Sequence, residues 1–176
     1  MSTFTPQFEA SGSLAAYLAN GFYQVAYVVP DVDAAVELYT KTLGAGTFMV
    51  LREAPVQNQT YRGESSEVTQ NIAFGYAGNL AIEIIQPLSG PSTYTELLDE
   101  RPQGGLHHVG VWVEDFDEAK TAIEAAGYPM VQYGEFAEST HFAYFDTTSV
   151  LGSYLEIFNW DEPTQQMFQA IREGTF

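Results

Sequence analysis

Four polar residues, Gln24, Glu83, His108 and Glu156, lie within apolar segments that have the composition of β-strands. Strand alternation puts each of them on one face of its strand, and the four occupy matching places in two similar parts of the chain. A carboxylate inside an apolar strand is costly to bury unless it is paired or bound to a cation. Because Glu83 and Glu156 share this problem at equivalent places, the pattern favours one divalent cation between them.

The donor set limits the choice of metal. Two carboxylates neutralise the ion, and the His108 imidazole with the Gln24 amide oxygen completes a nitrogen and oxygen set suited to Zn²⁺, Ni²⁺, Co²⁺, Mn²⁺ or Fe²⁺. Such a set leaves positions for water or substrate. Taken singly, a strand Glu is more often at a solvated edge, and a strand His is more often a satisfied core residue. The four together, in a chain with three histidines, favour the metal site.

The strands that carry these residues belong to an internal repeat. The segment GGLHHVGVWVEDFDEA at 104–119 matches FYQVAYVVPDVDAA, and residues 24–33 recur 84 positions later. In both copies a strand runs directly into a helix, for which Asp115 or Asp117 is the expected N-cap in the second copy. This pattern indicates an internal duplication.

The spacing of apolar residues, Gly and Pro predicts two βαβββ modules. The predicted divisions are a lead-in at 1–20, the first module at 21–88, a connector at 89–105, the second module at 106–160 and a C-terminal helix at 161–176. The polar stretch 57–65 is expected to be a lid or a surface loop. Met167, Phe168 and Ile171 form an apolar patch on the last helix, which would cover the domain or a second subunit.

Composition excludes several partners. The chain has 176 residues, 45% of them hydrophobic, and a formal charge of −17, which argues against nucleic acid, an anionic membrane surface or a polyanionic substrate. It has no cysteine and therefore no thiolate metal site. The N-terminus lacks a basic start, and no apolar run approaches the ~18 residues of a membrane span. A cytoplasmic protein is expected.

At this point the sequence resembles the vicinal oxygen chelate superfamily, which includes glyoxalase I, methylmalonyl-CoA epimerase, extradiol dioxygenases and bleomycin resistance proteins. The resemblance rests on QVAYVVPDVDAAVELYTKTLGA, LAIEIIQP, GGLHHVGVWVEDFDEA and GSYLEIFNW. It implies an α+β fold in which two βαβββ modules form an incomplete eight-stranded barrel around a metal held by Gln24, Glu83, His108 and Glu156. This ligand order is similar to that of glyoxalase I, whereas LHHVGVWVEDFDEA is more like the epimerase branch. The resemblance also implies a homodimer.

The expected function is that of a metal-dependent lyase or isomerase that abstracts a proton from a small, largely apolar carbonyl compound and stabilises the enolate. By resemblance Glu156 is the base, and Glu83 is the second candidate. The epimerase branch has another carboxylate near positions 48–50, where this chain has none, so a two-base epimerisation is in doubt. Few Lys and Arg residues are available for glutathione or coenzyme A.

Trp112, Tyr154 and Phe158 share strand faces with the ligands and are expected to line an apolar pocket, together with Ala26. His141 is either a proton shuttle there or a structural residue. By alternation His107 faces away from His108 and is expected to be structural.

Two alternatives stay open. A protein similar to the bleomycin resistance proteins would bind a hydrophobic ligand or drug without metal, and its ligand binding would be insensitive to EDTA. An Fe²⁺-dependent dioxygenase would consume oxygen, although Gln24 stands where such an enzyme would have a His.

Overall fold

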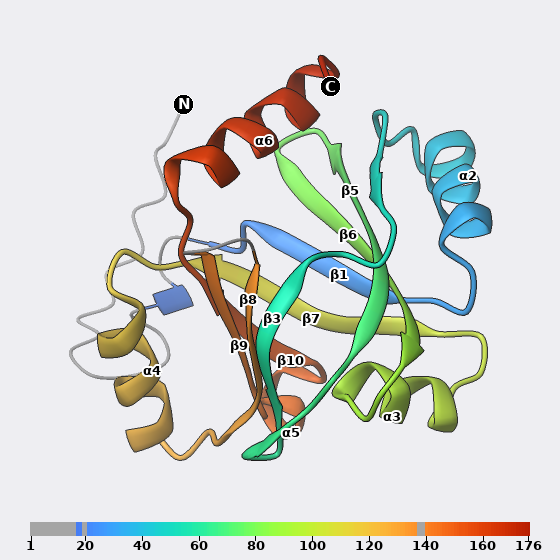
Figure 1. Ribbon diagram of the computed structural model, residues 1–176. Coiled ribbons are helices and arrows are strands. Elements are labelled where there is room, and N and C mark those ends of the chain that lie inside the picture. Colours follow the sequence, from blue (N-terminus) through green and yellow to red (C-terminus); the bar gives the residue numbers. More distant parts are fainter. Residues whose placement is uncertain (1–16, 19–20, 137–139) are drawn as a thin grey trace.

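The computed structural model describes residues 17–18, 21–136 and 140–176, so most of the predicted lead-in lies outside the described residues. The described chain forms a curled sheet with helices on its outside (Figure 1). Its strands are β1 (Gln24–Val28), β2 (Met49–Leu51), β3 (Val56–Tyr61), β4 (Glu64–Ser65), β5 (Thr69–Ala77), β6 (Leu80–Ser89), β7 (Gly105–Trp112), β8 (Met130–Phe136), β9 (Thr140–Phe145) and β10 (Tyr154–Phe158). Its helices include α2 (Val32–Leu43), α3 (Thr93–Glu100), α4 (Phe116–Ala125), α5 (Thr148–Leu151) and α6 (Glu162–Glu173).

The strand order β2-β5-β6-β1-β7-β10-β9-β8-β3-β4 puts the first strands of the two repeats side by side. β1 and β7 pair antiparallel at the centre, and each pairs on its other side with the last strand of its own repeat, in parallel. The two modules therefore join within one chain. The α+β half-barrel is confirmed, but its sheet has ten strands where eight were expected.

The additional strands come from the stretch at 57–65, which is neither a lid nor a loop. β3 pairs antiparallel with β8 of the second module, from Val56 opposite Phe136 to Tyr61 opposite Gln132. The polar composition of this stretch concealed a strand that covers the otherwise exposed edge of β8. β2 ends at Leu51 and β3 starts at Val56, so this short connection joins opposite ends of the strand order and requires the sheet to curl.

Two helices of the repeat cover opposite flanks of the sheet (Figure 1). α2 begins after Asp31, whose carboxylate accepts from two backbone N–H groups, and it ends at Gly44 in the left-handed conformation. α4 begins after Asp115, whose carboxylate accepts from the Glu118 N–H. Of the two predicted caps in the second repeat, Asp115 is therefore the one used. α2 packs against β5 and β6, and α4 packs against β9 and β10.

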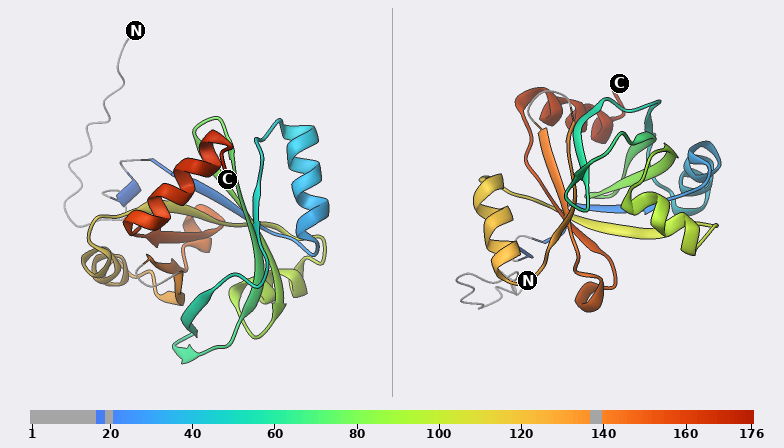
Figure 2. Two further views of the ribbon diagram at one scale, coloured as in Figure 1. Left: turned by 45° about the horizontal axis from the view of Figure 1, so that its top comes forward. Right: turned by 60° about the horizontal axis from the view of Figure 1, so that its bottom comes forward.

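The last helix, α6, lies across the end of the sheet, as both views in Figure 2 show together with Figure 1. Its buried Phe168 and Ile171 join a cluster that includes Phe74 and Tyr76 of β5. The apolar patch predicted on this helix thus packs on its own domain. Among the described helices, none is long and apolar enough to cross a membrane.

Candidate metal centre

Adjacent strands β6, β1, β7 and β10 bring the predicted ligand residues together. Gln24 of β1 and Glu156 of β10 both pair with Gly110 of β7, from the two sides of that strand. Glu83 of β6 and His108 of β7 both pair with Ala26 of β1, one step further along. The repeat thus places four inward-facing residues from separate parts of the sequence around one point.

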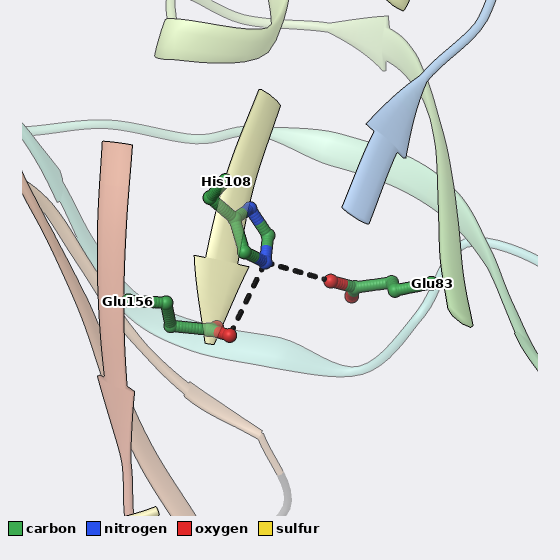
Figure 3. A group of neighbouring side chains, drawn as sticks. All are labelled: Glu83, His108 and Glu156. Carbon is green, nitrogen blue, oxygen red and sulfur yellow. Dashed lines mark ion pairs between the residues drawn. The ribbon is translucent and has the colours of Figure 1, made fainter. Parts of the chain in front are cut away.

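Glu83, His108 and Glu156 offer ligand atoms that lie within 4.8 Å of one another. His108 Nε2 is 3.2 Å from one carboxylate oxygen of each glutamate, as Figure 3 shows. The Gln24 amide nitrogen donates to Glu83 at 2.9 Å and to Glu156 at 3.2 Å. All four side chains are buried. Within the described parts of the chain, this is the group of His, Asp and Glu close enough to hold an ion.

The donor set fits a divalent cation. Two carboxylates face one imidazole in the protein interior, and such a concentration of negative charge requires a positive partner. Rotation of the Gln24 side-chain amide by 180° would exchange its nitrogen and its oxygen. The oxygen would then lie beside Glu83 and Glu156. The resulting nitrogen and three oxygen donors are those of first-row divalent ions.

In the absence of metal, protons on His108 and Glu156 offset the negative charge of the site. Burial lowers the pKa of His108, but Glu156 and Glu83 outweigh burial and raise it to about 9. Burial raises the pKa of Glu156, His108 opposes this effect, and the nearby Glu83 adds to it. Both groups therefore hold protons more strongly than usual, and a metal would replace those protons.

His107 does not face away from His108 as alternation predicted. A bulge in β7 places Ala26 opposite His108 but Tyr27 opposite Leu106. His107 therefore has no partner residue on β1. Its Nδ1 lies 2.8 Å from Nδ1 of His108, and both rings are buried. The sequence carried no signal for this bulge.

A hydrogen-bonded chain fixes which His108 nitrogen faces the carboxylates. The Thr93 hydroxyl donates to Gln132 Oε1 at 2.9 Å and therefore accepts from His107 Nε2 at 3.0 Å. Burial, together with His108, holds the pKa of His107 well below its usual value, so His107 is neutral and its Nδ1 accepts. His108 then donates through Nδ1, so its Nε2 faces Glu83 and Glu156, where it carries a proton in the protein alone and would bind a metal once that proton is lost.

A cavity of about 50 Å³ adjoins Gln24, Glu83 and Glu156. Tyr94 and Tyr144, which the sequence analysis missed, also line it, and their hydroxyls are 2.7 Å apart. The Tyr144 ring stacks on His108, with ring centroids 4.6 Å apart. The remaining wall is mainly apolar and consists of Val56, Ile72, Phe74, Phe136, Thr140, Phe142, Phe158, Trp160, Thr164 and Phe168.

Of the expected pocket residues, Phe158 lines this cavity, whereas Ala26, Trp112, Tyr154 and His141 do not. Trp112 is the last residue of β7 and lies on the outer surface, where its side chain is 46% exposed. Tyr154 lines a separate small cavity beside His107 and Arg101. His141 faces the opposite side of β9, where its Nδ1 lies 2.8 Å from the Tyr133 hydroxyl, because Phe142 and Tyr144 are the inward residues of that strand.

Comparison with known sequences gives one family. The sequence profile of the Glyoxalase/Bleomycin resistance protein/Dioxygenase superfamily matches residues 23–145. An ethylmalonyl-CoA/methylmalonyl-CoA epimerase from Cereibacter sphaeroides is 33% identical over 111 residues, which cover 63% of this chain and 74% of that protein. The mitochondrial methylmalonyl-CoA epimerase of Mus musculus is 29% identical over 115 residues, which cover 65% of this chain and 58% of that protein.

Solved structures agree on the fold. The methylmalonyl-CoA epimerase of Mycobacterium tuberculosis superposes with a TM-score of 0.59 at 18% identity, covering 87% of this chain and 96% of that one. A hypothetical protein from Bacillus halodurans gives a TM-score of 0.60 at 20% identity, covering 81% and 95%. Since epimerases are isomerases, the expected enzyme class is confirmed at that level by the sequence relatives. The profile covers well over half of the chain, and the protein therefore belongs to the glyoxalase, bleomycin resistance protein and dioxygenase superfamily.

Proposed function

We propose that this protein is a metal-dependent isomerase that removes a proton beside the carbonyl group of a small, largely apolar substrate. The observation that carries the proposal is the convergence of Glu83, His108 and Glu156 within 4.8 Å at the end of an apolar cavity. Gln24 completes the ligand set. When bound there, a divalent cation supplies a Lewis acid that stabilises negative charge on the substrate oxygen.

Glu156 is the proposed base. Burial raises its pKa, and a carboxylate whose pKa is closer to neutrality is a stronger base for carbon acids at the pH of a cell. Its position in β10 leaves it on the rim of the cavity, whereas His108 is fully buried beneath. Glu83 has the same exposure and is the matched comparison.

Few groups in the cavity could return a proton to the substrate after it has been removed. Apart from Glu83 and Glu156, the cavity lining contains no carboxylate in the described parts of the chain. The Tyr94 and Tyr144 hydroxyls are the other acidic protons there, and burial, with Glu83 acting on Tyr94 and Tyr94 acting on Tyr144, raises the pKa of both well above 10. These phenols stay protonated and can donate to a substrate oxygen. We therefore propose a single-base reaction in which Glu156 removes the proton from one carbon and returns it to the neighbouring carbon, since return to the same face of the same carbon would regenerate the substrate.

The size and charge of the site favour a small substrate group. A cavity of about 50 Å³ holds a few water-sized groups, so it fits only the reacting end of a larger molecule. The sequence relatives are named for coenzyme A thioesters, whose phosphates require cations. None of the residues that line this cavity is Lys or Arg.

Solvent isotope exchange tests the proposal without knowledge of the full substrate. Protein loaded with each candidate metal is incubated in D₂O with methylmalonyl-CoA and with small oxo acids and aryl ketones, and loss of the α-proton is followed by NMR. We expect exchange that EDTA abolishes and that Glu156→Gln lowers by about a thousandfold. Exchange that is unaffected by EDTA, or that Glu156→Gln leaves unchanged, contradicts the proposal.

The alternatives of the sequence analysis give different results in the same experiment. A metal-free binding protein would retain ligand without metal and exchange no proton, but it would have to bury two glutamates against one imidazole. An Fe²⁺ dioxygenase would consume oxygen. Its usual ligand set has two His and one carboxylate, whereas this group has one His and two carboxylates.

A further inference from the structure

A second cleft, of about 420 Å³, lies between α6 and the strand ends above the metal centre. Its walls are the aromatic residues Tyr23, Tyr76, Trp112, Trp160 and Phe168, with Gln165, Gln169 and Arg172 from α6. Trp160 and Phe168 line both this cleft and the metal-site cavity, so one pair of rings separates the two spaces. α6 lies outside the region that the superfamily profile matches.

The charge of this aromatic cleft is unusual for the protein. The chain has 23 Asp and Glu against 6 Lys and Arg, yet among the residues that the structure describes no carboxylate lines the aromatic cleft. A larger surface cleft beside α4 is acidic, as the composition of the chain predicts. It is lined by Glu114, Asp115, Asp117 and Glu118. The aromatic cleft has instead one cation, Arg172.

Arg172 is positioned to bind an anion. Its guanidinium lies 4.7 Å from the centre of the Tyr76 ring, which occupies one face of the guanidinium. The guanidinium also interacts with the Tyr23 hydroxyl, and its remaining N–H groups are available to an anion. Lys41, Arg52 and Arg62 each pair with a carboxylate, but within the described residues no carboxylate lies within 4.0 Å of Arg172. The Tyr76 hydroxyl is hydrogen-bonded to that of Tyr23, which fixes the ring beneath the cation.

The aromatic walls favour a flat ligand. Trp160 stacks on Phe168 with ring centroids 4.7 Å apart and an interplanar angle of 12°. The exposed Trp112 adds a large apolar surface that its own domain leaves uncovered. One cation and several rings together match a planar group that carries a single carboxylate, whereas a nucleotide carrier with several phosphates requires several cations.

We propose that the aromatic cleft is a ligand-binding site in its own right, which takes an aryl group that carries one carboxylate. Because the stacked Trp160 and Phe168 rings separate the cleft from the metal-site cavity, its ligand is a different molecule from the one proposed to react beside Glu156.

Calorimetric titration of EDTA-treated protein tests the aromatic cleft separately from the metal chemistry. The probes are phenylacetate, the neutral phenylacetamide and the non-aromatic cyclohexylacetate. The metal-site cavity of about 50 Å³ is too small to enclose phenylacetate, so bound phenylacetate reports the aromatic cleft. We expect phenylacetate to bind about tenfold more tightly than phenylacetamide, and more tightly than cyclohexylacetate.

Arg172→Gln should remove the preference for the anion, and Arg172→Lys should keep part of it. Arg101→Gln makes the same change of charge beside Tyr154, in a different cavity, and should leave the preference intact. Trp112→Leu should reduce the preference for the phenyl ring. Equal binding of phenylacetate and phenylacetamide, equal losses in the Arg172 and Arg101 variants, or stronger binding of coenzyme A would each overturn the proposal. Failure of proton exchange alone would refute the proposed function and leave these binding results unaffected.

Discussion

The two halves of the duplication contribute to the candidate metal centre in different ways. Each contributes one glutamate and one further polar residue: Gln24 with Glu83 from the first half, and His108 with Glu156 from the second. His108 is fixed from behind by His107 and Thr93. The Gln24 side chain instead contacts the other three residues of the group themselves. The repeat thus provides the four positions, and the second half adds hydrogen-bonded support behind its own member of the group.

The backbone shows the same asymmetry. Gly110 of the second half corresponds in the repeat to Ala26 of the first, 84 residues earlier. Ala26 is fully buried with its methyl group in place. At Gly110 an added Cβ would lie 2.8 Å from Glu156 Oε2 and 3.1 Å from Gln24 Cβ. Close packing on the second half therefore sets where the Glu156 carboxylate can lie.

The largest expected effect separates the two glutamates. Glu156→Gln should lower the rate of α-proton exchange by about a thousandfold, because it removes the base, while the isosteric side chain preserves the packing. Glu83→Gln should act mainly through weaker metal binding, so saturating metal should restore a large part of its rate. Rates measured across a metal titration distinguish these effects. If added metal rescues both variants alike, Glu156 is only a ligand and the halves do not differ in this respect.

Gly110 and Ala26, which occupy equivalent positions in the two halves, should differ in how substitution affects the exchange rate. Gly110→Ala should lower the exchange rate by about a hundredfold, because the new methyl group displaces the Glu156 carboxylate and misplacement of about 1 Å costs that much. The protein should stay folded, since the closest clash is with the end of a flexible side chain. Ala26→Gly should cost about 1 kcal/mol of stability with little effect on rate. Activity and thermal unfolding of both variants provide the test, and equal rates would show that Gly110 is not a positioning residue.

The sequence predicted the ligand group because strand alternation and repetition are local properties that survive folding. Gln24, Glu83, His108 and Glu156 each lie in a strand with regular pairing on at least one side. Phe158, two residues after Glu156, was placed in the cavity by the same reasoning. Glycine and proline likewise marked the helix ends, as at Gly44.

The incorrect predictions concern residues whose placement depends on neighbouring strands. A bulge in β7 turned His107 toward His108, and a bulge depends on which strand lies opposite rather than on the residues that it contains. β3 pairs with a strand about 75 positions later, and its partner could not be inferred from its own polar sequence. His141 and Trp112 were assigned from alternation without knowledge of where the sheet curls away from the cavity.

A smaller effect tests the hydrogen-bonded support in the second half directly. His107→Phe keeps a buried ring but removes the acceptor for His108 Nδ1, so the imidazole is free to rotate or to present N–H toward the carboxylates. We expect the dissociation constant for Zn²⁺ to rise about tenfold or more. Thr93→Val should give a smaller loss, because it acts one step further along the chain. Competition with a chromophoric chelator measures both constants. An unchanged Zn²⁺ affinity in His107→Phe would assign these residues to packing alone.

The smallest expected effect is on stability, and it again belongs to the second half, which carries both buried histidines. In the metal-free protein the pKa of His108 is raised to about 9, so its contribution to stability is complete below pH 6.5 and is lost as the pH rises through 9. The pKa of His107 is lowered, so its contribution is complete above pH 6.5 and is lost as the pH falls. Stability should therefore be greatest near pH 6.5, and Tm should fall by about 5 °C by pH 9.

His107→Phe should remove the fall of Tm on the acid side alone. Saturating Zn²⁺ should remove the fall of Tm on the alkaline side, because the metal replaces the proton on His108. Thermal melts across this pH range would contradict the argument if Tm rose steadily from pH 6.5 to 9 without metal, since both His108 and Glu156 hold protons more strongly in the folded protein.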